Sequence, residues 1–394
     1  MAKSLQHITV THVGSLVRPP ALIEFLEKID RGEAYDEAAY QECLRSSIAE
    51  AVRLQAEAGV EIVSDGEYGK TVNWAFYVHH RLGGLEMRAL TPEEMGDPAA
   101  AVIGGRDRAA FPEFYHEYDG RVLRNTMIAV RPVVTGPLSY RGQAELQRDI
   151  ANLKAGLGGI DARGFLPVVA PASAMPNAKV EYYRDEESFL FALAEALRQE
   201  YRAIIEAGLY LQVDDAFLPF MYEKLVPPMT LAQYRQWAEM RIAALNRALE
   251  GLPLERTRYH ICWGSWNGPH MFDIPLKEII DLVLKVRVGG FSFEAANPRH
   301  EHEWQVWKAV KLQPGQYIIP GVVTHSTNIV EHPELVAERL LRFAGCVGGE
   351  NLMAGTDCGF SQSPLAGRVH RTIMWAKLRA LAEGARLASH KLWS

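Results

Sequence analysis

The stretch Arg258-Tyr-His-Ile-Cys262 is a short run of strand-forming residues that ends in two side chains able to bind a metal ion. Side chains alternate between the two faces of a strand, so His260 and Cys262 point to the same face. Reactive residues at the carboxyl end of a buried strand are typical of a parallel α/β barrel, because the active site lies at that end. The stretch therefore predicts one strand of such a barrel.

The same arrangement recurs along the chain, where short apolar runs alternate with long amphipathic stretches. This order is typical of parallel α/β architecture. Most of the runs end in polar residues such as Asp, Glu, His or Cys. The predicted strands are His7–Val13, Glu61–Ser64, Ala129–Thr135, Phe165–Ala170, Tyr210–Val213, Arg258–Cys262, Gly290–Phe293, Tyr317–Val323 and Leu352–Gly355. The predicted helices are Asp36–Ala58, Glu186–Ala207, Thr230–Glu250, Pro275–Val286, Pro333–Gly345 and Gly367–Leu387.

These candidate strands exceed by one the number that a (β/α)8 barrel accommodates. One of them is expected to be an extra hairpin or a strand outside the barrel, and the sequence does not say which. The stretch Arg81–Tyr118 has no regular strand or helix pattern, which indicates an insertion or lid. We therefore predict an α/β protein, a (β/α)8 TIM barrel with an insertion around residues 81–118, in a single domain spanning residues 1–394.

Composition narrows the class of protein. Of the 394 residues 48% are hydrophobic and 23% charged, which is typical of a globular protein with a sizeable core. The net charge is −6 with the signs interspersed, so nothing predicts a nucleic-acid partner. No apolar run is long enough for a membrane span, and MAKSLQHITVTHVGS lacks the apolar segment of a signal peptide. These features favour a cytoplasmic protein, and whether copies of the chain associate stays open.

Two of the four cysteines differ from the others. Cys43 and Cys346 lie in helix-like patterns among apolar neighbours, where a reduced, packed thiol is expected. Cys262 ends one predicted strand and Cys358 follows another. His260, Cys262, Glu294 and Cys358 together form a borderline-soft donor set that suits tetrahedral Zn²⁺. Because these residues belong to three separate strands, the set is typical of a catalytic site on a rigid scaffold.

Seven segments resemble, in the same order, the catalytic C-terminal barrel of the cobalamin-independent methionine synthases. They are THVGSLVRP (11–19), VSDGEYGK (63–70), LQVDDAFLP (211–219), HICWGSW (260–266), FSFEAA (291–296), PGVVTHST (320–327) and GTDCGFS (355–361). The resemblance implies that His260, Cys262, Glu294 and Cys358 bind zinc. It also implies that Val13, Gly14 and Ser15 contact homocysteine through the backbone, that Glu67 and Asp214 lie near its amino group, and that His325 donates a proton.

Each of these positions also has an ordinary structural explanation. Gly14 could be a turn glycine, Asp214 a helix cap, and His325 a partner of a neighbouring backbone group. The chain also departs from the family pattern. It has room for one barrel, it carries Asp215-Ala216 where the family has Glu-Pro, and no tryptophan is clearly placed to stack on a folate.

The segment AANPRHEHEW (295–304) is more similar to the epoxyalkane–coenzyme M transferases, the 2-hydroxypropyl-CoM lyases, which join a zinc-bound thiolate to an epoxide. Arg299, His300 and His302 would then meet an anionic group, or they form a solvated charged helix start. The resemblance thus favours a zinc-dependent thiol alkyltransferase. The first hypothesis is an S-methyltransferase that makes methionine from homocysteine, with the methyl donor open. The alternatives are a lyase that adds a thiol to an epoxide, and a non-catalytic zinc-binding barrel.

Overall fold

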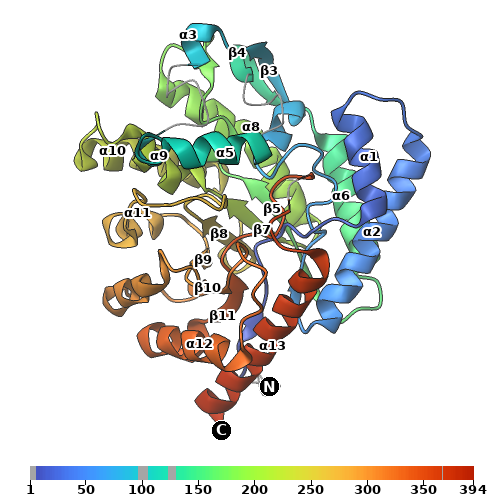
Figure 1. Ribbon diagram of the computed structural model, residues 1–394, viewed down its shortest axis with the longest axis vertical. Helices are drawn as coiled ribbons and strands as arrows, with labels where there is room; N and C mark the ends of the chain where they lie inside the picture. Colours follow the sequence, from blue (N-terminus) through green and yellow to red (C-terminus); the bar gives the residue numbers. More distant parts are fainter. Residues whose placement is uncertain (1–5, 96–104, 123–129, 366) are drawn as a thin grey trace.

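The computed structural model describes residues 6–95, 105–122, 130–365 and 367–394 (Figure 1). Eight strands form one sheet in the order β1-β11-β10-β9-β8-β7-β5-β2, and every pairing in it is parallel. The Glu61 N–H donates to the Val10 carbonyl at 3.0 Å, which links the two ends of the sheet into a nearly closed barrel. The strands are β1 (Thr9–Val10), β2 (Ile62–Val63), β5 (Arg163–Val169), β7 (Tyr210–Asp214), β8 (Thr257–Ile261), β9 (Gly290–Glu294), β10 (Tyr317–Val323) and β11 (Met353–Thr356).

The extra predicted strand lies outside the barrel. It is β4 (Val130–Tyr140), which pairs antiparallel with β3 (Leu82–Ala89) and parallel with β6 (Lys179–Val180) in a separate three-stranded sheet. The sequence analysis missed β3, whose Gly83-Gly84 pair hides the strand pattern, and β6, which has two residues. β4 is therefore the predicted strand for which the barrel has no place.

A ring of helices surrounds the barrel (Figure 1). It includes α1 (Pro20–Asp30), α2 (Glu37–Glu57), α6 (Gln143–Gly156), α8 (Glu186–Glu206), α10 (Leu231–Ala248), α12 (Pro333–Val347) and α13 (Arg371–Trp393). Side-chain caps explain why three of the predicted starts are right. Asp36 accepts from the Ala39 N–H at 3.1 Å, Asp185 accepts from the Ser188 N–H at 2.7 Å, and Thr230 forms a capping box with Gln233.

The predicted helix 275–286 is broken into η4 (Leu276–Glu278) and α11 (Ile280–Val283). The other helices in the described residues are α3 (Pro92–Met95), α4 (Arg106–Ala110), α5 (Pro112–Val122), α7 (Pro171–Ala174), α9 (Phe217–Leu225), η1 (Phe76–Arg81), η3 (Leu254–Arg256), η5 (Glu301–Ala309) and η6 (Gly349–Asn351). Across the described residues, no helix has the length and apolarity to cross a bilayer.

The predicted insertion around residues 81–118 is confirmed as β3, α3, α4 and α5. Its residues 96–104 lie outside the described part of the chain. Residue 129, the first of the predicted strand 129–135, also lies outside the described residues. So do residues 1–5 of the N-terminal segment MAKSLQHITVTHVGS. A single domain over residues 1–394 stays a prediction.

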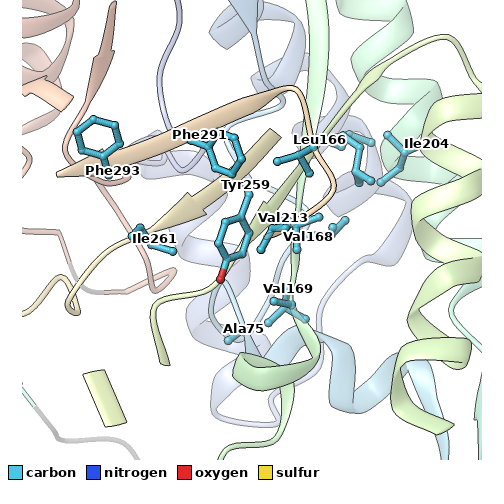
Figure 2. Close-up of a cluster of buried hydrophobic side chains, with 14 of the residues drawn as sticks. Ala75, Leu166, Val168, Val169, Ile204, Val213, Tyr259, Ile261, Phe291 and Phe293 are labelled. Atoms are coloured by element: carbon cyan, nitrogen blue, oxygen red, sulfur yellow. The ribbon is translucent and has the colours of Figure 1, made fainter. Parts of the chain in front are cut away.

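Strand alternation separates an apolar layer from a polar interior. Tyr259, Val213 and Phe291, from three neighbouring strands, lie together in the hydrophobic layer that also includes Ile204 of α8 (Figure 2). The alternate residues Gln212 and Arg258 instead donate hydrogen bonds across the barrel interior to the segment 11–13. The residues that end each strand on this inner face therefore project toward a common region.

Candidate metal centre and substrate pocket

A cavity of about 290 Å³ lies at the carboxyl ends of the barrel strands. The walls include residues that follow β1, β2, β7, β8 and β11, which are far apart in the sequence and adjacent in the barrel. Most of the residues that the sequence analysis selected meet here: Val13, Ser15, Glu67, Asp214, His260, Cys262 and Cys358 line the cavity.

His260, Cys262 and Cys358 form the centre of one wall. Their ligand atoms all lie within 4.8 Å of one another, the three residues are buried, and the two sulfurs are 3.8 Å apart in unbridged thiols. The His260 Nδ1 pairs with the Ser292 hydroxyl at 3.0 Å, while its Nε2 is buried with no hydrogen-bond partner among the described residues. An imidazole oriented by a neighbouring hydroxyl, with its other nitrogen directed at two sulfurs, fits a zinc site.

The two thiols influence each other's ionisation. The contact with the Cys262 thiol lowers the pKa of Cys358 well below its ordinary value, and His260 and His325 lower it further. The same interaction, together with burial, raises the pKa of Cys262. A thiol with a lowered pKa, beside a second thiol and an imidazole, is a donor set that suits a borderline-soft divalent cation.

Glu294, the fourth predicted ligand, ends β9 beside this group but is not one of the three clustered residues. Its Oε2 accepts a hydrogen bond from the Asn297 side chain at 3.0 Å. Burial raises the pKa of Glu294 well above its ordinary value, and the neighbouring Asp357 and Cys358 raise it further. A role for this carboxylate as a ligand stays a prediction.

Two buried carboxyl groups face the cavity. Glu67 is 3% exposed and Asp214 is 5% exposed. Burial raises the pKa of both, Asp214 the more strongly, and the negative charge of Glu67 adds to the effect on Asp214. The Lys70 ammonium, 3.6 Å from Glu67, offsets part of this effect. Buried carboxyls with raised pKa values are stabilised by a cationic partner, and a substrate ammonium is such a partner.

Gly14 shapes the backbone between two residues that line the cavity. It has φ +132°, a conformation that side-chain-bearing residues rarely adopt. A Cβ at this position would lie 2.7 Å from Pro167 Cγ and 3.2 Å from Glu67 Oε1. The predicted backbone contact at residues 13–15 therefore requires glycine in its centre.

Asp215 follows Asp214 in the chain yet has a different environment. Its Oδ1 accepts from the Ser173 hydroxyl at 2.6 Å and its Oδ2 from the Tyr259 hydroxyl at 2.7 Å. Asp214 lines the cavity, whereas Asp215 holds α7 and β8 in place through those two bonds. Asp215, which stands where the family has a glutamate, therefore has a structural role.

His325 lies after β10 and is buried near the thiols, outside the set of residues lining the cavity. Burial lowers the pKa of His325 to about 4, against the opposing effect of the Cys358 charge, so the ring is neutral at pH 7. Neither ring nitrogen makes a hydrogen bond of standard geometry within the described chain, although the Ser265 backbone lies near enough to favour protonation. A proton-donor role stays a prediction.

The three residues considered as an anion site do not reach the cavity described here. His300 is buried between Asp273 and Glu303, at 3.0 and 2.9 Å, and stacks on Trp263. The Arg299 guanidinium donates to the Met271 carbonyl at 2.7 Å, and His302 is exposed. At the start of η5, His300 therefore packs in the interior, whereas Arg299 and His302 are exposed to solvent.

Sequence reasoning missed most of the outer wall of the cavity. We call Arg108, Tyr115, Tyr118 and Trp266 the roof, since the first three belong to the insertion and Trp266 to the loop after β8. The Trp266 indole N–H donates to the Tyr115 hydroxyl at 3.1 Å. Further lining residues that the sequence analysis did not select include Trp74, Phe217, Phe220, Glu223, Gln362 and Arg368. Trp263 and Tyr140 are buried and pack in the hydrophobic core.

Comparison with known proteins extends the resemblance seen in the motifs, although no protein-family model matches the chain. The chain is 23% identical to the 2-hydroxypropyl-CoM lyase of Xanthobacter autotrophicus over 384 residues, covering 90% of this chain and 88% of that protein. It is 21% identical to the methionine synthase of Sulfolobus acidocaldarius over 395 residues, covering 100% and 95%.

Solved structures show the same fold. A B12-independent methionine synthase from a Shewanella species superposes with a TM-score of 0.71 at 19% identity, over 98% of this chain and 99% of that one. A Listeria monocytogenes protein described as a putative vitamin-B12-independent methionine synthase superposes with a TM-score of 0.67. The chain is therefore similar, along nearly its whole length, to methionine synthases and to a 2-hydroxypropyl-CoM lyase, and it has the barrel fold of the B12-independent methionine synthases.

Proposed function

We propose that the chain is a zinc-dependent enzyme that alkylates a small thiol, with homocysteine as the thiol and methionine as the product. The observation that carries this proposal is the presence of Glu67 and Asp214 in the same cavity as Cys262 and Cys358. Buried carboxyls at that position suit a thiol that also bears an ammonium. We assign the enzyme to the cytoplasm, where thiols stay reduced.

His260, Cys262 and Cys358 are the residues that would hold zinc, with Glu294 as the fourth ligand and the one that would exchange for substrate. A zinc ion held there would lower the pKa of a thiol and so supply a nucleophilic thiolate at neutral pH. Glu67 and Asp214 pair with the substrate ammonium, and the backbone of Val13, Gly14 and Ser15 orients the amino acid. The methyl donor is left open.

His325 is proposed to pass a proton to the leaving group rather than to store one, because its ring is neutral at pH 7. Replacement by alanine, His325→Ala, is expected to slow turnover while zinc content and thiol affinity stay normal. Full activity in that variant would remove His325 from the mechanism.

A titration of the zinc-loaded protein with homocysteine and with coenzyme M tests the proposal. Calorimetry in buffers of different ionisation enthalpy reports proton release, and metal content is assayed on the same sample. Homocysteine binding with proton release is the expected result. Glu67→Gln should weaken homocysteine binding by about tenfold to a hundredfold, the range for a hydrogen bond to a charged group. An unchanged affinity in that variant would count against an amino-acid thiol.

A second candidate is the addition of a sulfonate thiol to an epoxide. The similarity to a 2-hydroxypropyl-CoM lyase and the presence of Arg108 and Arg368 in the cavity wall favour it. Coenzyme M has no ammonium, so Glu67→Gln should leave its affinity unchanged. Binding of coenzyme M without homocysteine would select this candidate.

A third hypothesis is that the chain is a non-catalytic zinc-binding barrel. It requires ligands closed off from any substrate, whereas Cys262 and Cys358 both line the cavity. A zinc-loaded protein that binds neither thiol would favour it.

A further inference from the structure

A layer of buried polar side chains lies beneath the cavity, inside the barrel, and the proposed reaction does not use it. Gln212 of β7 and Arg258 of β8 are each 1% exposed. Both reach across the barrel to the segment that follows β1, which leads into the cavity wall at Val13 and Ser15. Packing alone would select apolar residues at such positions.

Gln212 joins two groups that belong to the candidate thiol site. Its Nε2 donates to the Asp214 Oδ1 at 2.7 Å and also to the Val13 carbonyl. Both partners accept hydrogen bonds, so the amide nitrogen must face them. The Gln212 Oε1 is then buried with no partner among the residues that the structure describes. A buried oxygen without a hydrogen-bond partner costs stability. Glutamine at this position therefore indicates that its two donated hydrogen bonds outweigh the cost of leaving its oxygen unpaired.

Arg258 reinforces the same arrangement from the next strand. Its guanidinium donates to the Thr11 hydroxyl at 2.8 Å and to the His12 carbonyl at 3.0 Å, and it stacks over the Phe165 ring. Burial lowers the pKa of Arg258 to about 10, so it stays charged at pH 7, and the charge of Asp214 supports it. Asp214 thus has a hydrogen-bond donor and a buried positive charge below it.

We propose that Gln212 is a positioning residue that fixes the direction of the Asp214 carboxyl group, so that it can receive the ammonium of the substrate thiol. The proposal rests on the proposed function, because it assumes an amino-bearing thiol. The physical reason is that a donated hydrogen bond fixes the direction of the oxygen that accepts it. The second bond, to the Val13 carbonyl, fixes the distance between Asp214 and the backbone that orients the amino acid.

The test compares Gln212→Met with Gln55→Met. Methionine matches glutamine in length and cannot donate hydrogen bonds. Gln55 is also fully buried and bonds His12 and Ser64, without contacting Asp214, so it controls for the loss of a buried amide. Each zinc-loaded protein is titrated with homocysteine and with 4-mercaptobutyrate, which lacks only the amino group. Cobalt-substituted samples report through their thiolate absorption whether the metal centre is intact.

We expect Gln212→Met to weaken homocysteine binding by about tenfold to a hundredfold. Affinity for 4-mercaptobutyrate should change by less than about threefold, and the cobalt spectrum should not change. Gln55→Met should keep the wild-type preference for homocysteine. Equal weakening for the two thiols in Gln212→Met, or a preserved preference, overturns the positioning role while the proposed function stands. Wild-type protein that shows no preference for homocysteine overturns both.

Discussion

The two sides of the cavity are built differently. We call the side formed by Val13, Glu67, Asp214, His260, Cys262 and Cys358 the floor; it follows the carboxyl ends of five parallel strands. The roof comes from the insertion and the loop after β8, and side-chain hydrogen bonds join these segments to each other and to α9. Besides Trp266 to Tyr115, the Met271 N–H donates to Asp107 at 3.0 Å and the Asp107 N–H to Glu223 at 3.2 Å. The residues proposed to hold the metal and the substrate therefore lie at the ends of paired strands, whereas loops and short helices form the other side of the cavity.

The largest effect is expected on the floor. Cys358→Ser should reduce zinc from about one ion per chain to nearly none and abolish activity, because serine is a poor ligand for zinc at neutral pH. Metal analysis after desalting measures this. Cys346→Ser, which alters a half-buried thiol on α12, is the matched control and should keep its zinc. Equal zinc in the two variants would remove Cys358 from the metal centre.

A smaller effect separates two neighbouring residues within the floor region. Asp214→Asn should weaken homocysteine binding by about tenfold to a hundredfold with little change in stability, since the lost group faces the cavity. Asp215→Asn should lower the free energy of unfolding by about 1–3 kcal/mol while folded protein binds the thiol normally. Calorimetric titration and denaturant unfolding on both variants measure the contrast. The reverse pattern would show that the two roles are exchanged.

The smallest effect is expected in the roof. The Arg106 guanidinium donates to the carbonyls of Glu223 and Phe272, at 3.2 and 3.3 Å, and anchors α4. Arg106→Ala should raise the KM of one substrate by about fivefold, the equivalent of one net hydrogen bond, and leave zinc content unchanged. Arg45→Ala, which removes an exposed arginine paired with Glu42 on α2, is the control. A loss of zinc in Arg106→Ala would mean that roof and floor are not independent.

The sequence by itself determined the elements with a strong local signal. The alternation of side chains along β8 was enough to put His260 and Cys262 on one face, and the capping residues Asp36 and Thr230 fixed two helix starts. Gly14 and Glu67 were found through motifs, and both belong to the region around the cavity. Each of these signals is local, because strand period and capping depend on neighbours a few residues away.

Only the tertiary structure decided which candidate strand stays outside the barrel, because the residues of a strand do not by themselves determine which strand it pairs with. It alone separated Asp214, which ends β7, from Asp215, the residue after it, since their different roles depend on Gln212, Ser173 and Tyr259. It also brought the roof residues of the insertion to the cavity, across more than a hundred positions of the chain in the case of Tyr115 and Trp266. The physical reason is the same in each case: these contacts join distant segments, and no local pattern records them.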